Sequence, residues 1–354
     1  MSSNLFYILE IAFMLLGILF ACQVFTNAIE NLGEKLNLAH EFTGSVLAAV
    51  GTALPETLLP LVAIFLASQH QATATAKHDI AIGAIVGAPF MLATLAMFLL
   101  GLSIVVHQKQ RKKFFAASAH DAKFLKVNSR HLKRDLIFFL ITFSLGISVA
   151  AFESLQQFAN YIAYALLALY VLYLYQTYTH SQAEVPANEE AETHTPKLYL
   201  STYAKMPDKL STILLQTFIG LIGIIYFAEH FIKDVEHISS LIGLSPLVLS
   251  LIVSPIATEL PEKVNTWLWS SEGKDTLALG NVTGAMVFQA AIPCFIGITL
   301  TPWHLEKLSL ICALLAIGST IILYLQISIS QKIGYKTLLL CGSLYLLYLL
   351  SIFF

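Results

Sequence analysis

Long apolar runs separated by short polar segments extend along almost the whole chain. A transmembrane helix needs about 20 predominantly apolar residues, and runs of roughly that length occur ten times. The pattern therefore predicts an all-α integral membrane protein with about ten transmembrane helices. The predicted spans are 5–28, 41–68, 79–106, 135–151, 158–178, 212–233, 240–269, 276–301, 305–326 and 335–354.

Composition supports this interpretation. Of the 354 residues, 57% are hydrophobic and only 12% are charged. Soluble domains usually have about 25% charged residues, so this chain lacks the side chains needed for a water-facing surface. A soluble globular protein is thereby excluded.

Two polar segments interrupt the spans. The loop 107–134 carries nine of the Lys and Arg residues, and the segment 179–210 contains four glutamates and reads as a solvated linker. With the basic loop in the cytoplasm, 16 of the 20 Lys and Arg residues lie inside, 3 lie outside, and Lys263 lies within a span. The positive-inside rule then predicts a cytoplasmic loop and linker and places both termini outside. The chain divides into a first half, 1–178, the linker 179–210, and a second half, 211–354.

A short motif recurs in the two halves. Residues 51–56 read Gly-Thr-Ala-Leu-Pro-Glu, and residues 257–262 read Ala-Thr-Glu-Leu-Pro-Glu. A second pair follows, Gly-Ala-Ile-Val-Gly-Ala at 83–88 and Gly-Asn-Val-Thr-Gly-Ala at 280–285. Each half holds five spans, an odd number, so we expect the second to be inverted relative to the first. Inverted repeats with interrupted helices indicate the binding site of a secondary transporter.

The motifs contain residues that break helices. Gly51 and Pro55 are expected to interrupt the second span, and Pro255 and Pro261 the seventh, because proline cannot donate a helical hydrogen bond. Carbonyl groups freed at membrane depth are tolerated only where they face protein or a water-lined cavity. They are also suitable oxygen ligands for a hard cation.

Glu56 and Glu262 lie near the middle of their spans. A carboxylate at that depth costs several kcal/mol unless it is paired, protonated or bound to an ion. Together with Thr52 and Thr258, one turn earlier, they offer oxygen ligands suited to Ca²⁺ or Na⁺. The alternative is that each glutamate stays protonated and bonds to a neighbouring helix, which leaves the repetition of the Pro-Glu pair unexplained.

Other residues of the motifs admit two interpretations each. Asn281 and Gln289 either bind the cation or form hydrogen bonds between packed helices. Glu259 is a further candidate cation ligand. With Lys263 it has the i,i+4 spacing of an ion pair, and the Lys263 ammonium could instead occupy the place of a second cation. Small residues at four-residue spacing let helices approach closely, which is the role expected of Gly83, Gly87, Gly280 and Gly284.

These repeated motifs resemble the α-repeats of the calcium/cation antiporter superfamily, the sodium/calcium exchanger-like transporters. The resemblance implies ten helices, a cation site at the membrane midplane and alternating access. It matches the family's central carboxylates with Glu56 and Glu262 and its motif threonines with Thr52 and Thr258. Family members usually carry serine after the motif threonine and asparagine or aspartate after the glycine pair. The residues found at those positions here are Ala53, Glu259, Ala88, Leu92, Ala285 and Gln289.

The expected function is a secondary active cation antiporter that exchanges Ca²⁺ or another cation for Na⁺ or H⁺. With so few ligands, H⁺ taken up by the buried carboxylates is an alternative to Na⁺ as the counter-ion. A degenerate relative that binds a cation as a sensor or scaffold is a second hypothesis. An intramembrane enzyme is disfavoured because the chain has no paired intramembrane aspartates and no Gly-x-Ser-x-Gly or His-Glu-x-x-His motif.

The resemblance also bears on partners and location. We expect inorganic cations and membrane lipid as partners, no nucleic acid, and no cofactor apart from the transported cation. Compact loops favour a bacterial inner membrane.

Overall fold

The computed structural model describes residues 2–35, 54–69, 74–115, 123–125, 127–184 and 197–353. Within them, eight helices are long and apolar enough to cross a membrane, and two shorter apolar helices lie within residues 56–69 and 246–256. Each of the ten predicted spans overlaps one of these helices. The prediction of an all-α, multi-pass membrane protein is therefore confirmed.

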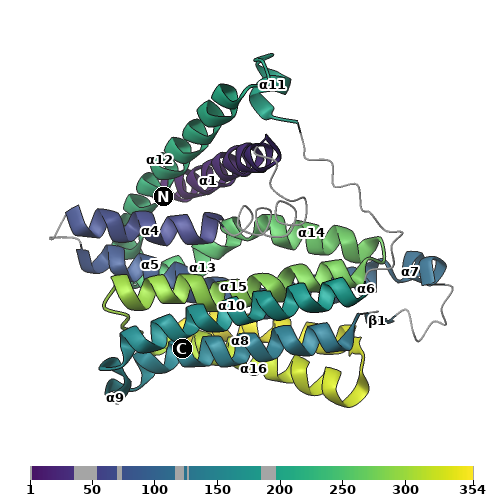
Figure 1. Ribbon diagram of the computed structural model, residues 1–354. Helices are drawn as coiled ribbons and strands as arrows, with labels where there is room; N and C mark the ends of the chain where they lie inside the picture. The colour runs from purple at the N-terminus through teal and green to yellow at the C-terminus, as the bar shows by residue number, and fades with distance from the viewer. Residues whose placement is uncertain are drawn as a thin grey trace. The chain divides into compact units, whose positions relative to one another are not determined.

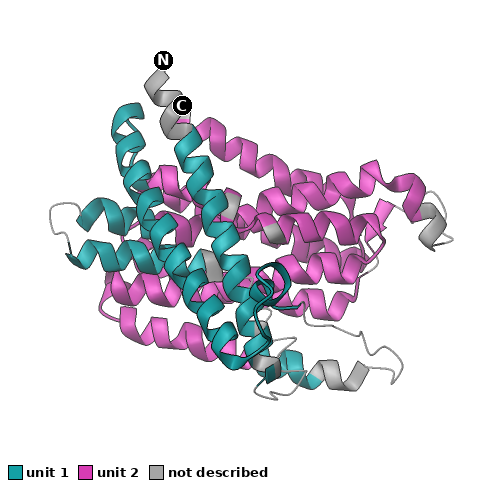
Figure 2. Ribbon diagram, turned by 90° about the horizontal axis from the view of Figure 1, so that it is seen from above, with its two compact units in different colours: residues 1–81, 174–246 teal, residues 82–173, 247–354 magenta. Residues whose placement is uncertain are grey.

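The chain forms two compact units (Figure 2). Unit 1 comprises residues 1–81 and 174–246, and unit 2 comprises residues 82–173 and 247–354. Each unit therefore draws on both halves of the sequence. The predicted repeat boundaries at 178 and 211 follow the internal similarity of the sequence instead, and they remain a prediction.

Unit 1 is built around two long helices, α1 and α12, which lie side by side (Figure 1). Glycines allow this close approach: a Cβ atom at Gly220 would lie 2.8 Å from the Cα of Phe25, and one at Gly17 would lie 2.4 Å from the Phe227 ring. The elements of unit 1 are α1 (Ser2–Lys35), α4 (Leu54–Gln69), the first part of α5 (Ala74–Met91), the last part of α10 (Ala159–Glu184), α11 (Tyr199–Tyr203) and α12 (Leu210–Ile242).

A polar network ties the end of the linker to these two helices. Gln216 of α12 donates to the Val24 carbonyl at 3.0 Å and to Asn27 Oδ1 at 2.8 Å. Its own side-chain oxygen accepts from the Leu200 amide at 2.8 Å, and Asn27 accepts from the Tyr199 amide at 3.0 Å. The predicted cytoplasmic linker thus ends against the C-terminal part of α1, whose following loop is predicted to lie on the same side.

Unit 2 holds the larger apolar core. Phe139 and Phe143 stack with ring centroids 5.1 Å apart, and Phe90 meets the edge of Tyr348 at 5.0 Å. Besides the remaining parts of α5 and α10, the unit contains a π-helical segment, η3 (Leu92–Ala96), α6 (Met97–Val106), α7 (Gln108–Phe115), β1 (Phe124–Leu125), α8 (Ser129–Ala151), α9 (Glu153–Gln156), α13 (Pro246–Thr258), α14 (Leu260–Ser271), α15 (Asp275–Leu300), α16 (Lys307–Ser330), β2 (Ile333–Gly334) and α17 (Tyr335–Phe353).

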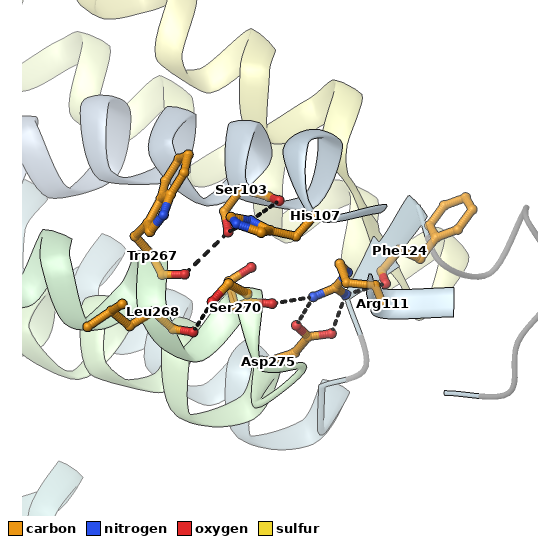
Figure 3. Close-up of polar contacts among 9 residues, drawn as sticks. Ser103, His107, Arg111, Phe124, Trp267, Leu268, Ser270 and Asp275 are labelled. Carbon is orange, nitrogen blue, oxygen red and sulfur yellow. Dashed lines mark hydrogen bonds and ion pairs between the residues drawn. The ribbon is translucent and has the colours of Figure 1, made fainter. Parts of the chain in front are cut away.

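Three loops of unit 2, those between α6 and α8, α14 and α15, and α16 and α17, meet around Arg111 (Figure 3). Arg111 of α7 binds Asp275 through two hydrogen bonds of 2.6 and 2.7 Å and donates to the Ser270 carbonyl at 2.9 Å. It also donates to the carbonyl of Phe124, whose strand β1 pairs antiparallel with β2. These loops lie on one face in the predicted topology, which agrees with their contacts here. Which side of the membrane that face meets remains a prediction.

The burial of Arg111 was not predicted from the sequence, which presented it as one of nine basic residues in a cytoplasmic loop. Its side chain and that of Asp275 are both fully buried. A bidentate arginine–carboxylate pair has strong directional hydrogen bonds. The pair therefore fixes the loop between α6 and α8 to the start of α15.

We predict that Arg111→Met destabilises the protein by about 3–5 kcal/mol, because it leaves the Asp275 carboxylate buried without its counter-charge. Thermal unfolding of the purified protein in detergent measures this loss. The control is Lys274→Ala, which removes one partner of the exposed Lys274–Glu272 pair and should change little. Equal melting temperatures for Arg111→Met and the unaltered protein would contradict the prediction.

Candidate functional site

The seventh predicted span is broken at Glu259. Helix α13 ends at Thr258, α14 begins at Leu260, and Glu259 lies between them with φ −96° and ψ 11°. Pro261 occupies the start of α14, where a missing backbone N–H costs nothing. Pro255 lies inside α13, so it does not end the helix as the sequence suggested.

Glu262 lies in the first turn of α14 and is only 2% exposed. Within the described part of the chain, neither of its carboxylate oxygens has a hydrogen-bond partner. The N-terminus of a helix favours a negative charge through its unpaired N–H groups. Glu262 is thus placed as a buried carboxyl group whose oxygens are available to a cation or a proton.

Beside it lies an ion pair. Lys263 Nζ is 3.2 Å from Glu259 Oε2, and both side chains are buried. Gln289 of α15 donates to the other carboxylate oxygen of Glu259 at 3.4 Å. Asn281, about two turns earlier on the same helix, donates to the backbone carbonyl of Glu262 at 3.4 Å. The structure therefore brings together all four of these predicted residues with Glu262 around the break.

Thr258 has a different environment. It is buried at the end of α13, and its hydroxyl donates to the Ser254 carbonyl one turn earlier at 3.1 Å. The hydroxyl hydrogen is thus used within the helix, whereas the oxygen lone pairs can still accept. A role for Thr258 as a ligand remains a prediction.

The first-half motif adopts the same local arrangement. Helix α4 begins at Leu54, so Pro55 is its second residue and Glu56 lies in its first turn. Glu56 is 3% exposed. Gly51 and Thr52 lie outside the described residues. Among the described residues, each Pro-Glu pair therefore lies in the first turn of a helix and carries a buried carboxylate, Glu56 in unit 1 and Glu262 in unit 2.

Two of the four predicted packing glycines bring helices into close contact. A Cβ atom at Gly83 would lie 2.3 Å from the Leu247 carbonyl oxygen, and one at Gly87 would lie 2.2 Å from the Leu251 carbonyl oxygen. Helix α5 thus lies directly on the backbone of α13. The Leu251 carbonyl is the group whose helical donor is missing, because residue 255 is a proline.

The second glycine pair behaves differently. Around Gly280, no described atom lies within 4 Å of an added Cβ atom, and at Gly284 the nearest is the Tyr173 hydroxyl at 3.8 Å. Among the described residues, close helix packing is therefore seen for the first pair and not for the second. The packing role of Gly280 and Gly284 remains a prediction.

One contact at this site had no signal in the sequence. Lys263 Nζ also donates to Met91 Sδ at 2.9 Å and to the Pro255 carbonyl at 2.8 Å. Met91 is the last residue of α5, just before the π-helical segment η3. Ser319 of α16 donates to the Ala93 carbonyl within that segment at 2.6 Å. π-Helical turns are frequent at functional sites, and this one adjoins the Lys263 contact.

Comparison with known proteins identifies the family. The model of the sodium/calcium exchanger protein family matches residues 6–179 and 212–354. The chain belongs to the sodium/calcium exchanger family. The segment left unmatched between these ranges coincides closely with the predicted linker 179–210.

Individual relatives agree with this assignment. An uncharacterised membrane protein of Methanocaldococcus jannaschii is 24% identical over 348 residues, which is 98% of each chain. The crystal structure of the H⁺/Ca²⁺ exchanger CAX matches with a TM-score of 0.69 and 15% identity, over 98% of this chain and 82% of that one. A structure of the sodium–calcium exchanger NCX_Mj matches with a TM-score of 0.55 and 20% identity, over 98% and 99%.

These matches confirm the resemblance inferred from the repeated motifs and the membrane fold that it implied. The family and the structural neighbours are transporters, so the prediction that the chain is not an enzyme is also confirmed. Inorganic cations are what the exchanger family transports.

We predict that Gly87→Ala destabilises the exchanger by about 1–3 kcal/mol, because the added methyl group overlaps the Leu251 carbonyl and forces α5 away from α13. Thermal unfolding in detergent provides the measurement. Gly318→Ala in α16 is the matched control, since nothing described lies within 4 Å of its added Cβ atom. If the two variants melt at the same temperature, the packing role assigned to Gly87 is wrong.

Proposed function

We propose that this exchanger-family chain is a secondary active antiporter. It moves Ca²⁺ or another cation across the membrane in exchange for H⁺ or Na⁺, by alternating access. The observation that carries the proposal is Glu262, a buried carboxylate in an apolar protein, with no described hydrogen-bond partner for either oxygen. A charged side chain at membrane depth marks an ion pathway by default.

The local charges support this role. The negative charge of Glu259 is balanced by Lys263 at 3.2 Å, so the pair contributes no net charge to its surroundings. Glu262, in the first turn of α14, is the second carboxylate beside this pair. Its charge must be balanced by a cation or removed by a proton, because leaving it uncompensated is strongly unfavourable. A group that alternates between these two states can exchange one ion for the other.

The ligand chemistry narrows the choice of ions. Carboxylate and amide oxygens, here those of Glu262, Gln289 and Asn281, are the ligands that hard cations such as Ca²⁺ prefer. The usual serine, asparagine and aspartate ligands of the family are absent at Ala88, Leu92 and Ala285. A smaller ligand set favours H⁺ as the counter-ion, since a proton needs only a carboxylate. The neighbouring structures, an H⁺/Ca²⁺ exchanger and a sodium–calcium exchanger, represent both forms of coupling.

Glu56 is proposed to play the corresponding role in unit 1. It occupies the same position as Glu262 relative to its helix, in the first turn after a Leu-Pro pair, and it is equally buried. Because the two glutamates have the same position in their helices and similar burial, we assign them the same role in ion exchange. The proposed location is a bacterial inner membrane, with the loop 107–134 and the linker 179–210 in the cytoplasm.

The test is uptake of radiolabelled Ca²⁺ into proteoliposomes that contain the purified protein, with an outward Na⁺ or H⁺ gradient imposed in parallel samples. We predict gradient-driven uptake, larger with H⁺ than with Na⁺. Glu262→Gln and Glu56→Gln should each reduce uptake to the level of protein-free vesicles, because a neutral amide can neither balance the cation nor release a proton.

Glu272→Gln is the matched control, since Glu272 ends the same helix but is half exposed and pairs with Lys274. It should transport like the unaltered protein. Saturable Ca²⁺ binding without uptake under either gradient would support the alternative, a cation-binding sensor or scaffold. Full uptake by Glu262→Gln would refute the proposed role of this carboxylate.

A further inference from the structure

The Lys263 side chain is held in a site built from the broken helix. Its Nζ atom lies 2.8 Å from the Pro255 carbonyl oxygen, 3.2 Å from Glu259 Oε2 and 2.9 Å from Met91 Sδ. The side chains of Glu259 and Lys263 are 0% and 8% exposed. The ammonium is therefore a buried cation, and these three groups come from two segments of unit 2.

Two of these groups are of the type that binds alkali-metal ions. The Pro255 carbonyl belongs to the last turn of α13, where helix ends carry partial negative charge. Its oxygen accepts the Glu259 amide at 3.3 Å and has a second lone pair for the Lys263 ammonium. Glu259 adds a full negative charge. Carbonyl groups at the C-terminal ends of broken membrane helices coordinate Na⁺ in secondary transporters. The surroundings of Nζ thus have the chemistry of a monovalent-cation site.

The internal repeat shows that the two charges occur together. At the offset of 206 residues that aligns the two motifs, Ala53 corresponds to Glu259 and Thr57 corresponds to Lys263. The first half therefore has neither charge, and the second half has both. A buried carboxylate without a counter-charge is strongly destabilising, so the lysine supplies within the chain the cation that Glu259 requires.

We infer that the Lys263 ammonium is a tethered cation that fills a Na⁺-type subsite formed by Glu259 and the Pro255 carbonyl. The subsite is occupied in every state of the protein, so Glu259 is not a ligand of the transported ion. Glu262 is then the carboxylate of unit 2 that serves exchange. This inference deepens the proposed antiport and rests on it for its functional meaning, but the occupancy of the subsite can be tested without transport.

The test is equilibrium binding of radiolabelled Na⁺ to the purified protein, with choline as the replacement cation. Lys263→Ala should bind one additional Na⁺ per chain compared with the unaltered protein, because the Glu259 carboxylate and the Pro255 carbonyl then surround a vacated space. The double variant Glu259→Gln/Lys263→Ala should not show this gain, since its subsite has lost the negative charge.

Lys233→Ala is the matched control. Lys233 and Glu229 have the same i,i+4 spacing on α12, but both are exposed. Removing that lysine should create no Na⁺ site. The melting temperature provides a second measurement: it should rise with Na⁺ concentration for Lys263→Ala and should not respond in the double variant.

Three results would overturn the inference. They are an unchanged Na⁺ stoichiometry in Lys263→Ala, an equal gain in the double variant, and a Lys263→Ala protein that stays unfolded in Na⁺ while the double variant folds. None of these depends on Ca²⁺ flux. Loss of flux in Glu262→Gln together with no Na⁺ gain in Lys263→Ala would leave the antiport standing and refute the tethered cation alone.

Discussion

A carboxylate inside a membrane protein is costly unless a cation lies beside it or a proton neutralises it. This constraint acts on two glutamates in the same turn of unit 2, and the chain meets it differently for each. Glu259 has the Lys263 ammonium at 3.2 Å. Glu262, three residues further on, has no described hydrogen-bond partner for its carboxylate. The first charge is balanced within the chain, and the second depends on a mobile ion or a proton.

The scaffold around these residues follows from the same requirement. A break at Glu259 supplies the end of α13 and the start of α14, so that the Pro255 carbonyl meets the Lys263 ammonium and Glu262 lies in the first turn of α14. The break is held by α5, whose glycines Gly83 and Gly87 lie directly on the carbonyl groups of α13. At the other end of α14, the buried Arg111–Asp275 pair fixes the loop that leads into α15.

Much of this architecture could be predicted from the sequence. Apolar run length was enough to locate the spans, and the repeated Leu-Pro-Glu motif located both buried carboxylates. The contacts that depend on tertiary packing could not be predicted. Arg111 looks like any other residue of a basic loop, and Met91 is an ordinary apolar residue until α5 brings it to Lys263. Pro255 suggested a helix end, yet it lies inside α13, and Gly87 of α5 packs against the Leu251 carbonyl that it leaves without a helical donor.

The central claim is that Glu262 holds the exchanged cation. Equilibrium dialysis of the purified protein against radiolabelled Ca²⁺ tests it most directly, because it requires neither a gradient nor a completed transport cycle. We predict saturable binding that is lost in Glu262→Gln and retained in Glu272→Gln. Equal binding by Glu262→Gln and the unaltered protein, or no saturable binding by the unaltered protein, would contradict it.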